Sequence, residues 1–351
     1  MLRIGVLLGD DIGLEVVPEC IKVMQAAAGR VGLDVEWQEL PIGRRGHALH
    51  GHTLPAVTAE ALETLDGWVL GPIGHSAYPR NDPTWIMPPV RTRFGLFACI
   101  KPVKSYPNLA SVHKQVDIVF VREVTEGLQS PSIVLMGSGE FRPNDDITIG
   151  TRVITRRGSN RVAREAFEIA RTRRRKKVTA VHKEPVYRLA CGMFAEECRR
   201  VAAEFPDVAF EEAMVDTFAM KLVMNPQQYD VVVTTNQFGD ILTDEGAGLV
   251  GGLGLAPGLC VGERHAMSQA THGSAPDIAG KGIANPYAMI MSGTMLFEWL
   301  SRKHDEPKAA AAARLIEKAM DAVISEAKTL TPDLGGKAST TQMGDAVAAA
   351  V

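Results

Sequence analysis

Two aspartates four residues apart mark the most chemically informative segment of the sequence. Asp240 and Asp244 follow an apolar run and lie within the segment 236–245. If a helix begins near Gly239, residues at positions i and i+4 share one face, one turn apart. Two carboxylates presented in this way suit a hard cation such as Mg²⁺ or Mn²⁺. The alternative is that the acidic residues only stabilise a helix N-terminus.

A second candidate segment, 272–286, gathers glycines and prolines next to polar side chains. Such a loop lets the backbone approach a ligand closely, and Asp277 is placed to accept hydrogen bonds from ribose hydroxyls, as the acidic residue of a dinucleotide site does. The G-x-G-x-x-G fingerprint does not occur at a strand–helix turn of this sequence. An ordered surface loop is the alternative interpretation.

Strand-like apolar runs alternate with helical patterns, which predicts an α/β fold with much parallel pairing. The predicted strands cover residues 2–8, 35–40, 67–70, 94–103, 116–121, 177–181 and 229–234. The predicted helices cover residues 14–28, 159–171, 193–204, 286–304 and 308–328, with Ser159 as the N-cap of the second. The stretch 136–157 reads as a β-rich arm that either pairs with a partner chain or forms an internal hairpin.

The composition excludes several classes of protein. Of 351 residues, 46% are apolar and 23% are charged, which is typical of a soluble globular protein, and the length allows two domains. The net charge of -3 provides no basic excess, so we expect no nucleic-acid partner. No apolar run reaches the length of a membrane span, so we expect no membrane partner.

The cysteines argue against a disulfide framework and against a zinc site. They are odd in number and scattered, without CxxC spacing: Cys20, Cys99, Cys191, Cys198 and Cys260. This usage predicts a reducing, cytoplasmic location.

Several segments together resemble the isocitrate/isopropylmalate dehydrogenase family of decarboxylating β-hydroxyacid dehydrogenases. Residues 9–16 (GDDIGLEV) resemble the opening motif GDGIGxEV, and residues 236–245 match the motif NxFGDILxDE. Residues 251–257 resemble a glycine-leucine segment of the family, and residues 272–286 match its cofactor loop closely. Two long motifs in the expected order are far more specific than one glycine pattern.

The resemblance implies a two-domain α/β fold of the isopropylmalate dehydrogenase type, which is not a standard Rossmann fold. Residues 1–100 and 252–351 would form an outer, cofactor-binding domain. Residues 101–251 would form an inner domain with the dimer interface, and the arm near 136–157 would reach the partner subunit. The active sites of such a homodimer lie between domains and are completed by the second subunit.

The resemblance also implies roles for individual residues in catalysis. Asp240 and Asp244 match metal-binding carboxylates of the family. Asp216 matches a third metal-binding carboxylate, which the partner subunit contributes and which also has a catalytic role. Lys183 matches the catalytic lysine, again contributed across the dimer, which takes the proton of the substrate hydroxyl. The implied metal is Mg²⁺ or Mn²⁺, with K⁺ as an additional candidate.

Substrate and cofactor contacts carry over in the same way. Arg91 and Arg122 match arginines that bind substrate carboxylates, and Lys101 holds a third such position without the planar fork of arginine. The segment before Arg91 carries Trp85 and Met87, which suit an apolar substituent and make isocitrate a poor fit, although Trp85 is equally suited to packing. The matched cofactor contacts are Ile12, His272, Gly273, Ser274, Ala275, Asp277, Ile278 and Asn285. Asp277 favours NAD, because a carboxylate repels the 2′-phosphate of NADP.

The sequence departs from the family pattern at positions close to this chemistry. Gln129 stands where the family has a tyrosine acid, and an amide cannot donate a proton as an acid. Pro185 replaces an asparagine near the catalytic lysine, Gln269 replaces a glutamate, and Asp11 replaces a glycine. These changes bear on the reaction more than on the fold.

We therefore expect an NAD-dependent, metal-assisted dehydrogenase that oxidises and decarboxylates a 2-hydroxy dicarboxylic acid such as 3-isopropylmalate. The alternatives are a dehydrogenase of the tartrate/D-malate type and a catalytically weak regulatory paralogue.

Overall fold

The computed structural model of the protein describes residues 1–74, 78, 87–128 and 139–351. Two predicted site residues, Trp85 and Gln129, lie outside these ranges, and so does the side chain of Met87. Among the described residues, no helix combines the length and the apolar character needed to cross a membrane.

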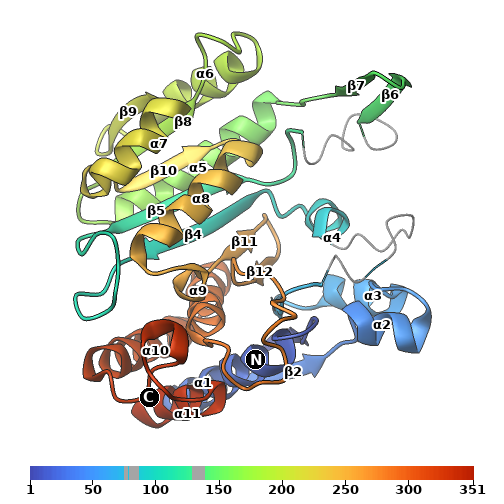
Figure 1. Ribbon diagram of the computed structural model, residues 1–351, viewed down its shortest axis with the longest axis vertical. Coiled ribbons are helices and arrows are strands. Elements are labelled where there is room, and N and C mark those ends of the chain that lie inside the picture. The colour runs from blue at the N-terminus through green and yellow to red at the C-terminus, as the bar shows by residue number, and fades with distance from the viewer. Residues whose placement is uncertain (75–77, 79–86, 129–138) are drawn as a thin grey trace.

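A mixed sheet of ten strands runs through the molecule (Figure 1). Its order is β2 (Val35–Glu39), β1 (Leu2–Leu7), β3 (Gly67–Leu70), β12 (Ala266–Ser268), β11 (Leu259–Val261), β4 (Ala98–Lys104), β5 (Asp117–Glu123), β10 (Val231–Thr234), β8 (Lys177–His182) and β9 (Ala209–Met214). The pairs are parallel except where β11 meets β12 and β4, and where β4 meets β5. Strands β5, β8 and β10 are buried and rich in Val, Ile and Thr, which is typical of parallel strands covered by helices on both faces.

The first and last parts of the chain share one group of helices. These are α1 (Gly13–Val31), α9 (Tyr287–His304), α10 (Pro307–Glu326) and α11 (Thr340–Ala350), which pack on one another. Smaller helices α2 (Gly43–His50) and α3 (Ala56–Thr64) lie in the same half of the molecule, and α4 (Met87–Arg93) lies between the two halves (Figure 1). The two chain termini therefore meet in one half.

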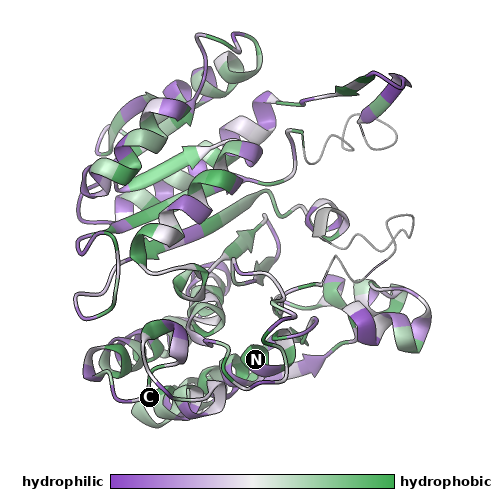
Figure 2. Cartoon of the chain, in the orientation of Figure 1, coloured by the Kyte–Doolittle hydropathy of each residue, from purple (hydrophilic) through white to green (hydrophobic). Residues whose placement is uncertain are grey.

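The middle of the chain supplies the other helices. On one side, α5 (Arg156–Thr172) packs against α6 (Ala190–Ala202). On the other, α7 (Val215–Met224) contacts α8 (Asn236–Val250), which lies over β4 and β5. Figure 2 shows β10 and its neighbours as strongly hydrophobic between these helices. The predicted boundaries of the two domains, at residues 100 and 251, stay a prediction.

A hairpin of β6 (Glu140–Asn144) and β7 (Ile147–Gly150) extends away from the body of the molecule (Figure 1). Every residue of the two strands is exposed in a single chain, including Phe141, Ile147 and Ile149. The β-rich character predicted for residues 136–157 is confirmed over 140–150, whereas 136–138 lie outside the described residues and α5 already begins at Arg156. Pairing of the arm with a partner stays a prediction.

The predicted α/β alternation is confirmed, with corrections at element ends. Ser159 is not the N-cap of α5, because that helix begins earlier: the hydroxyl of Thr155 accepts a hydrogen bond from the Gly158 amide at 3.0 Å. The first helix is longer than the predicted range 14–28, since α1 continues to Val31 before Gly32 adopts a left-handed conformation.

Candidate active site

The carboxyl ends of four parallel strands lie along one edge of the sheet. Thr234 of β10 pairs with Arg122 of β5 and with Val181 of β8, and His182 pairs with Met214 of β9. Side chains that follow the ends of parallel strands meet at such an edge, where α/β proteins bind ligands.

Helix α8 presents the predicted metal-binding carboxylates. It begins at Asn236, three residues before the predicted start, and its first turn carries no acidic residue. Stabilisation of a helix N-terminus therefore does not account for Asp240 and Asp244, which lie one turn apart on the same face. The carboxylate of Asp240 is 45% exposed and pairs with the buried guanidinium of Arg122.

Arg122 is held in place by the start of α8. Its Nε and Nη2 donate to Oδ1 of Asn236 at 3.1 and 2.6 Å. The amide nitrogen of Asn236 in turn donates to the carbonyl of Glu126 at 2.8 Å. The guanidinium is thus fixed beside Asp240 before any ligand binds, which lowers the cost of ordering it on binding.

Lys101 reaches the same face of α8 from β4. Its buried amine donates to Oγ1 of Thr243 at 3.0 Å, and burial lowers its pKa. Burial raises the pKa of Asp244, with the positive charge of Lys101 opposing that shift and the like charge of Asp240 adding to it. The charges of Lys101, Asp240 and Asp244 therefore interact electrostatically.

Arg91, near the end of α4, completes the set of predicted substrate cations. Asp240 is among the charges that act on it. Its buried Nε has no hydrogen-bond partner among the described residues. A buried guanidinium N–H without a partner is costly, and an incoming carboxylate would satisfy it.

Lys183 and Asp216 lie together but apart from these groups. The Lys183 amine donates to Asp216 at 2.6 Å, and this bond lowers the pKa of the carboxyl group. Lys183 follows β8, two strands from β5, a separation of roughly 10 Å at the usual strand spacing. Among the described residues, the one set of three ligand groups close enough to share a metal does not include Asp216, Asp240 or Asp244.

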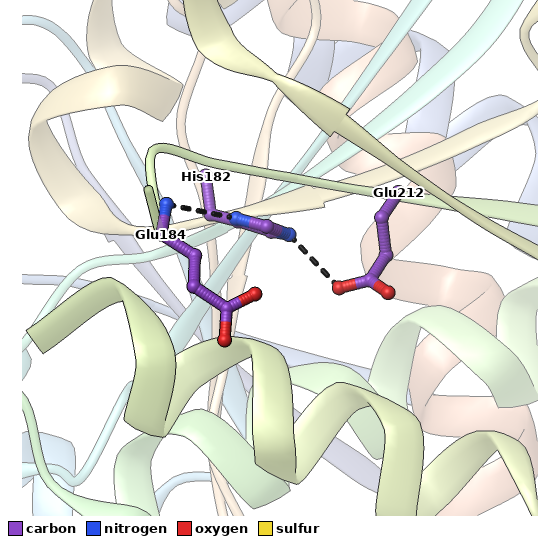
Figure 3. Close-up of side chains that lie close together, drawn as sticks. All are labelled: His182, Glu184 and Glu212. Carbon is purple, nitrogen blue, oxygen red and sulfur yellow. Dashed lines mark hydrogen bonds and ion pairs between the residues drawn. The ribbon is translucent and has the colours of Figure 1, made fainter. Parts of the chain in front are cut away.

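That set is His182, Glu184 and Glu212, drawn in Figure 3. Nε2 of His182 lies 3.0 Å from Glu212, and the Glu184 amide donates to its Nδ1 at 3.2 Å (Figure 3). Arg199 bridges the two carboxylates through Nη2, which lies 2.6 Å from Glu184 and 2.9 Å from Glu212. Since both ring nitrogens and both acids are engaged, this network is a brace that fixes the chain on either side of Lys183. Sequence reasoning missed it, because only the strand pairing brings Glu212 to His182.

The predicted cofactor loop packs against the first strand–helix turn of the chain. The amide of Ile12 donates to the carbonyl of Ser274 at 3.2 Å, and the amide of Gly280 donates to Glu15 at 2.6 Å. Asn285 is anchored through its amide to Asp333 at 2.9 Å. Asp277 and Gly273 remain exposed at the surface of the loop. The structure thus brings the predicted cofactor residues at both ends of the sequence together.

Buried polar atoms without a partner gather at this junction. Among the described residues they include Asp11 Oδ2, Glu15 Oε2, Thr271 Oγ1 and His272 Nε2. Burial lowers the pKa of His272, and its Nδ1 lies 3.0 Å from the Gly273 carbonyl, which places the proton on Nδ1. Nε2 is then an unused acceptor. Unused acceptors of this kind fit a ligand with several hydroxyl or amino donors, such as a dinucleotide.

Asp11 shows how the chain accommodates one departure from the motif. Its backbone has φ 50°, a left-handed conformation that glycine adopts freely and that strains other residues. Its carboxylate pairs with Arg44 at 2.7 Å, which offsets part of that strain.

The whole chain resembles known dehydrogenases. The family model described as isocitrate/isopropylmalate dehydrogenase matches residues 3–347. The chain belongs to this family. It is 38% identical to 3-isopropylmalate dehydrogenase of Methanothermobacter thermautotrophicus, over 99% of this chain and 98% of the relative. It is 39% identical to isocitrate/homoisocitrate dehydrogenase of Thermus thermophilus, with the same coverage.

The fold agrees with this assignment. The crystal structure of isocitrate dehydrogenase from Methylococcus capsulatus superposes with a TM-score of 0.88 at 37% identity, covering 100% of this chain and 99% of the other. The predicted family and fold class are therefore confirmed, and the protein is an oxidoreductase of the decarboxylating dehydrogenase class that acts on CH–OH groups.

Proposed function

We propose that the protein oxidises and decarboxylates a 2-hydroxy dicarboxylic acid such as 3-isopropylmalate, with NAD and a divalent metal ion. The observation that carries this proposal is the convergence of Arg91, Lys101 and Arg122 on the α8 face that presents Asp240 and Asp244. Three cations beside two carboxylates can bind a dianion and a metal ion together.

Within this site, each residue has a distinct task. Arg91, Arg122 and Lys101 bind the two carboxylates of the substrate and orient its hydroxyl towards α8. A divalent ion held by Asp240 and Asp244, with Asp216 of the partner subunit, would acidify that hydroxyl and stabilise the enolate left by decarboxylation. Lys183 of the partner subunit would accept the hydroxyl proton, and NAD bound at the 272–286 loop would supply the hydride acceptor.

The chain offers the surfaces that a shared site requires. Exposed apolar side chains gather on α7 and α8: Met220, Val223, Met224 and Ile241. The hairpin β6–β7 adds a second exposed apolar set. Exposed apolar side chains grouped on these elements support a homodimer in which α7, α8 and the hairpin meet their copies.

The choice of NAD follows from charge. Asp277 is exposed on the cofactor loop, free to accept a ribose 2′-hydroxyl. The same carboxylate would repel a 2′-phosphate. NAD should therefore be used in clear preference to NADP.

The direct test measures NADH absorbance and released CO₂ together. The protein, with Mn²⁺ or Mg²⁺ and K⁺, is incubated with NAD and with 3-isopropylmalate, D-malate, tartrate or isocitrate. Equal NADH and CO₂ from 3-isopropylmalate supports the proposal. Turnover with D-malate or tartrate instead would change the substrate, and silence with all four acids while NAD still binds would favour a regulatory subunit.

A further inference from the structure

Two cysteines far apart in the sequence lie directly opposite each other in the sheet. Cys99 of β4 and Cys260 of β11 are partners in an antiparallel pair. Direct antiparallel partners have Cα atoms about 4.5–5.5 Å apart. A disulfide needs a Cα separation of about 4.4–6.8 Å. The backbone therefore already meets the distance requirement of a disulfide.

The two side chains face each other as free thiols. Both are buried, with exposed fractions of 4% and 1%, in an apolar cluster that includes Val90, Phe94 and Met267. The hydrogen bond between the two thiols is the largest influence on the acidity of each. Because direct partners in an antiparallel pair point their side chains to the same face of the sheet, the two thiols lie side by side before any oxidation.

The pair borders the cations of the proposed substrate site. Arg122 of β5 is the direct partner of Cys99 on its other side, so Cys260, Cys99 and Arg122 stand in one row across the sheet. Lys101 lies two residues along β4, on the same face. Arg91 also acts on both thiols.

These surroundings divide the two thiols into different chemical roles. The hydrogen bond from Cys260, together with Lys101, Arg91 and Arg122, lowers the pKa of Cys99 below that of a free thiol, against the opposing effect of burial. The pKa of Cys260 is raised instead, by the same hydrogen bond and by burial. A thiolate next to a neutral thiol is the arrangement of an attacking and a resolving cysteine.

The three other cysteines of the chain can be compared with Cys99 and Cys260. Cys20, Cys191 and Cys198 lie in α1 and α6 and are fully buried. Burial raises the pKa of Cys20 to about 12 and also raises that of Cys198. Cys20 and Cys198, buried thiols with raised pKa values, are of the inert kind. Cys191 differs from them, since Arg152 lies 3.7 Å from its sulfur, but it lies in a helix and has no cysteine as a strand partner.

We propose that Cys99 and Cys260 form an oxidisable dithiol that a peroxide converts into an intrachain disulfide beside the substrate cations. The Cys99 thiolate attacks one peroxide oxygen, the O–O bond breaks, and a sulfenic acid and hydroxide result. The Cys260 sulfur then attacks the Cys99 sulfur, the S–O bond breaks, and water leaves. The pair loses two electrons and two protons, the peroxide becomes two molecules of water, and an external thiol reverses the change.

Substrate binding should oppose oxidation of Cys99; this inference rests on the proposed function. A bound dianion occupies the cations that otherwise stabilise the thiolate, so it lowers the thiolate fraction and blocks the approach to Cys99. Oxidation should therefore slow severalfold when a dianionic substrate is bound.

The test uses the full-length protein, first reduced and then treated with hydrogen peroxide. Free thiols are blocked with N-ethylmaleimide after unfolding, and the peptides are weighed. We expect one disulfide, between the peptides of Cys99 and Cys260, with the other three cysteines alkylated, and full reversal by dithiothreitol. Cys198→Ser should form the same disulfide at the same rate. Cys260→Ser should form none, leaving a Cys99 sulfenic acid that dimedone traps.

Two results would overturn the proposal. One is a native protein that keeps five alkylatable thiols at peroxide concentrations that oxidise free cysteine. The other is a disulfide that forms only after unfolding. Because the wild-type masses decide the question, a poorly folded variant does not obscure it.

A separate arm repeats the oxidation with 3-isopropylmalate present. Slower oxidation supports the coupling between the dithiol and the substrate site. If the disulfide forms as fast with 3-isopropylmalate as without it, the oxidisable dithiol is still supported. That result would instead argue that 3-isopropylmalate does not bind the neighbouring cations.

Discussion

Gly239 of α8 lies so close to Arg122 that a Cβ added to the glycine would come within 2.6 Å of the arginine Cγ. Gly239 is buried on the inner face of α8, next to Asp240, and the Arg122 side chain is buried against it. The arginine can therefore pass beneath α8 only because residue 239 has no side chain.

The first prediction follows from this contact. Gly239→Ala should push the guanidinium away from Asn236 and Asp240 and lower kcat/KM for the dicarboxylate at least about tenfold, since misplacement of a positioning group by about 1 Å has a larger effect than that. NAD affinity, measured by fluorescence titration, should stay unchanged. Gly248→Ala is the matched control in the same helix, because a Cβ there meets no atom within 4 Å. Equal kinetics for both variants would contradict the positioning role.

The second prediction concerns pH. Because burial lowers the pKa of Lys101, its ammonium group loses its proton at a lower pH than an exposed lysine does. The positive charge is present below that pKa and lost above it, so the dissociation constant of the dianion should rise as pH increases through it. Lys101→Arg should remove this alkaline rise, since arginine stays protonated.

Calorimetric titration of the dianion across the alkaline range measures this effect. Lys104→Arg, on the exposed part of the same strand, is the control and should behave as wild type. An alkaline rise that persists in Lys101→Arg would assign the titration to another group.

The site was predictable from the sequence where its residues are neighbours in the chain. Asp240 and Asp244 belong to one helix, so their spacing alone places them on one face. The cross-strand partners Cys99 and Cys260 are not predictable in this way, because their contact depends on the register of β4 and β11. Strand β9 was missed because Glu211 and Glu212 interrupt its apolar pattern at the edge of the sheet.

The third prediction concerns the N-terminal end of α5, which the sequence pattern placed at Ser159. Thr155 and Ser159 are both plausible N-caps by residue type, and only the structure identifies Thr155 as the cap that bonds the Gly158 amide. Thr155→Ala should lower the free energy of unfolding by about 1 kcal/mol. Urea denaturation measures the change, and a variant as stable as wild type would argue against this cap.

The fourth prediction tests whether active sites are shared between subunits. Within one chain, Lys183 forms an ion pair with Asp216, and Asp240 forms a separate ion pair with Arg122. Lys183→Ala and Asp240→Asn should each be inactive as homodimers. If the two groups meet only across a dimer, a mixed dimer contains one site with both native residues and one site with neither.

Unfolding the two variants together and refolding them should therefore restore activity. Random assortment makes half of the dimers mixed, each with one intact site of two, so recovery should approach about a quarter of the wild-type rate. Each variant refolded alone is the control for recovery by itself. A mixture that stays as inactive as its components would place Lys183 and Asp240 in the same subunit's site, and the homodimeric mechanism would have to be abandoned.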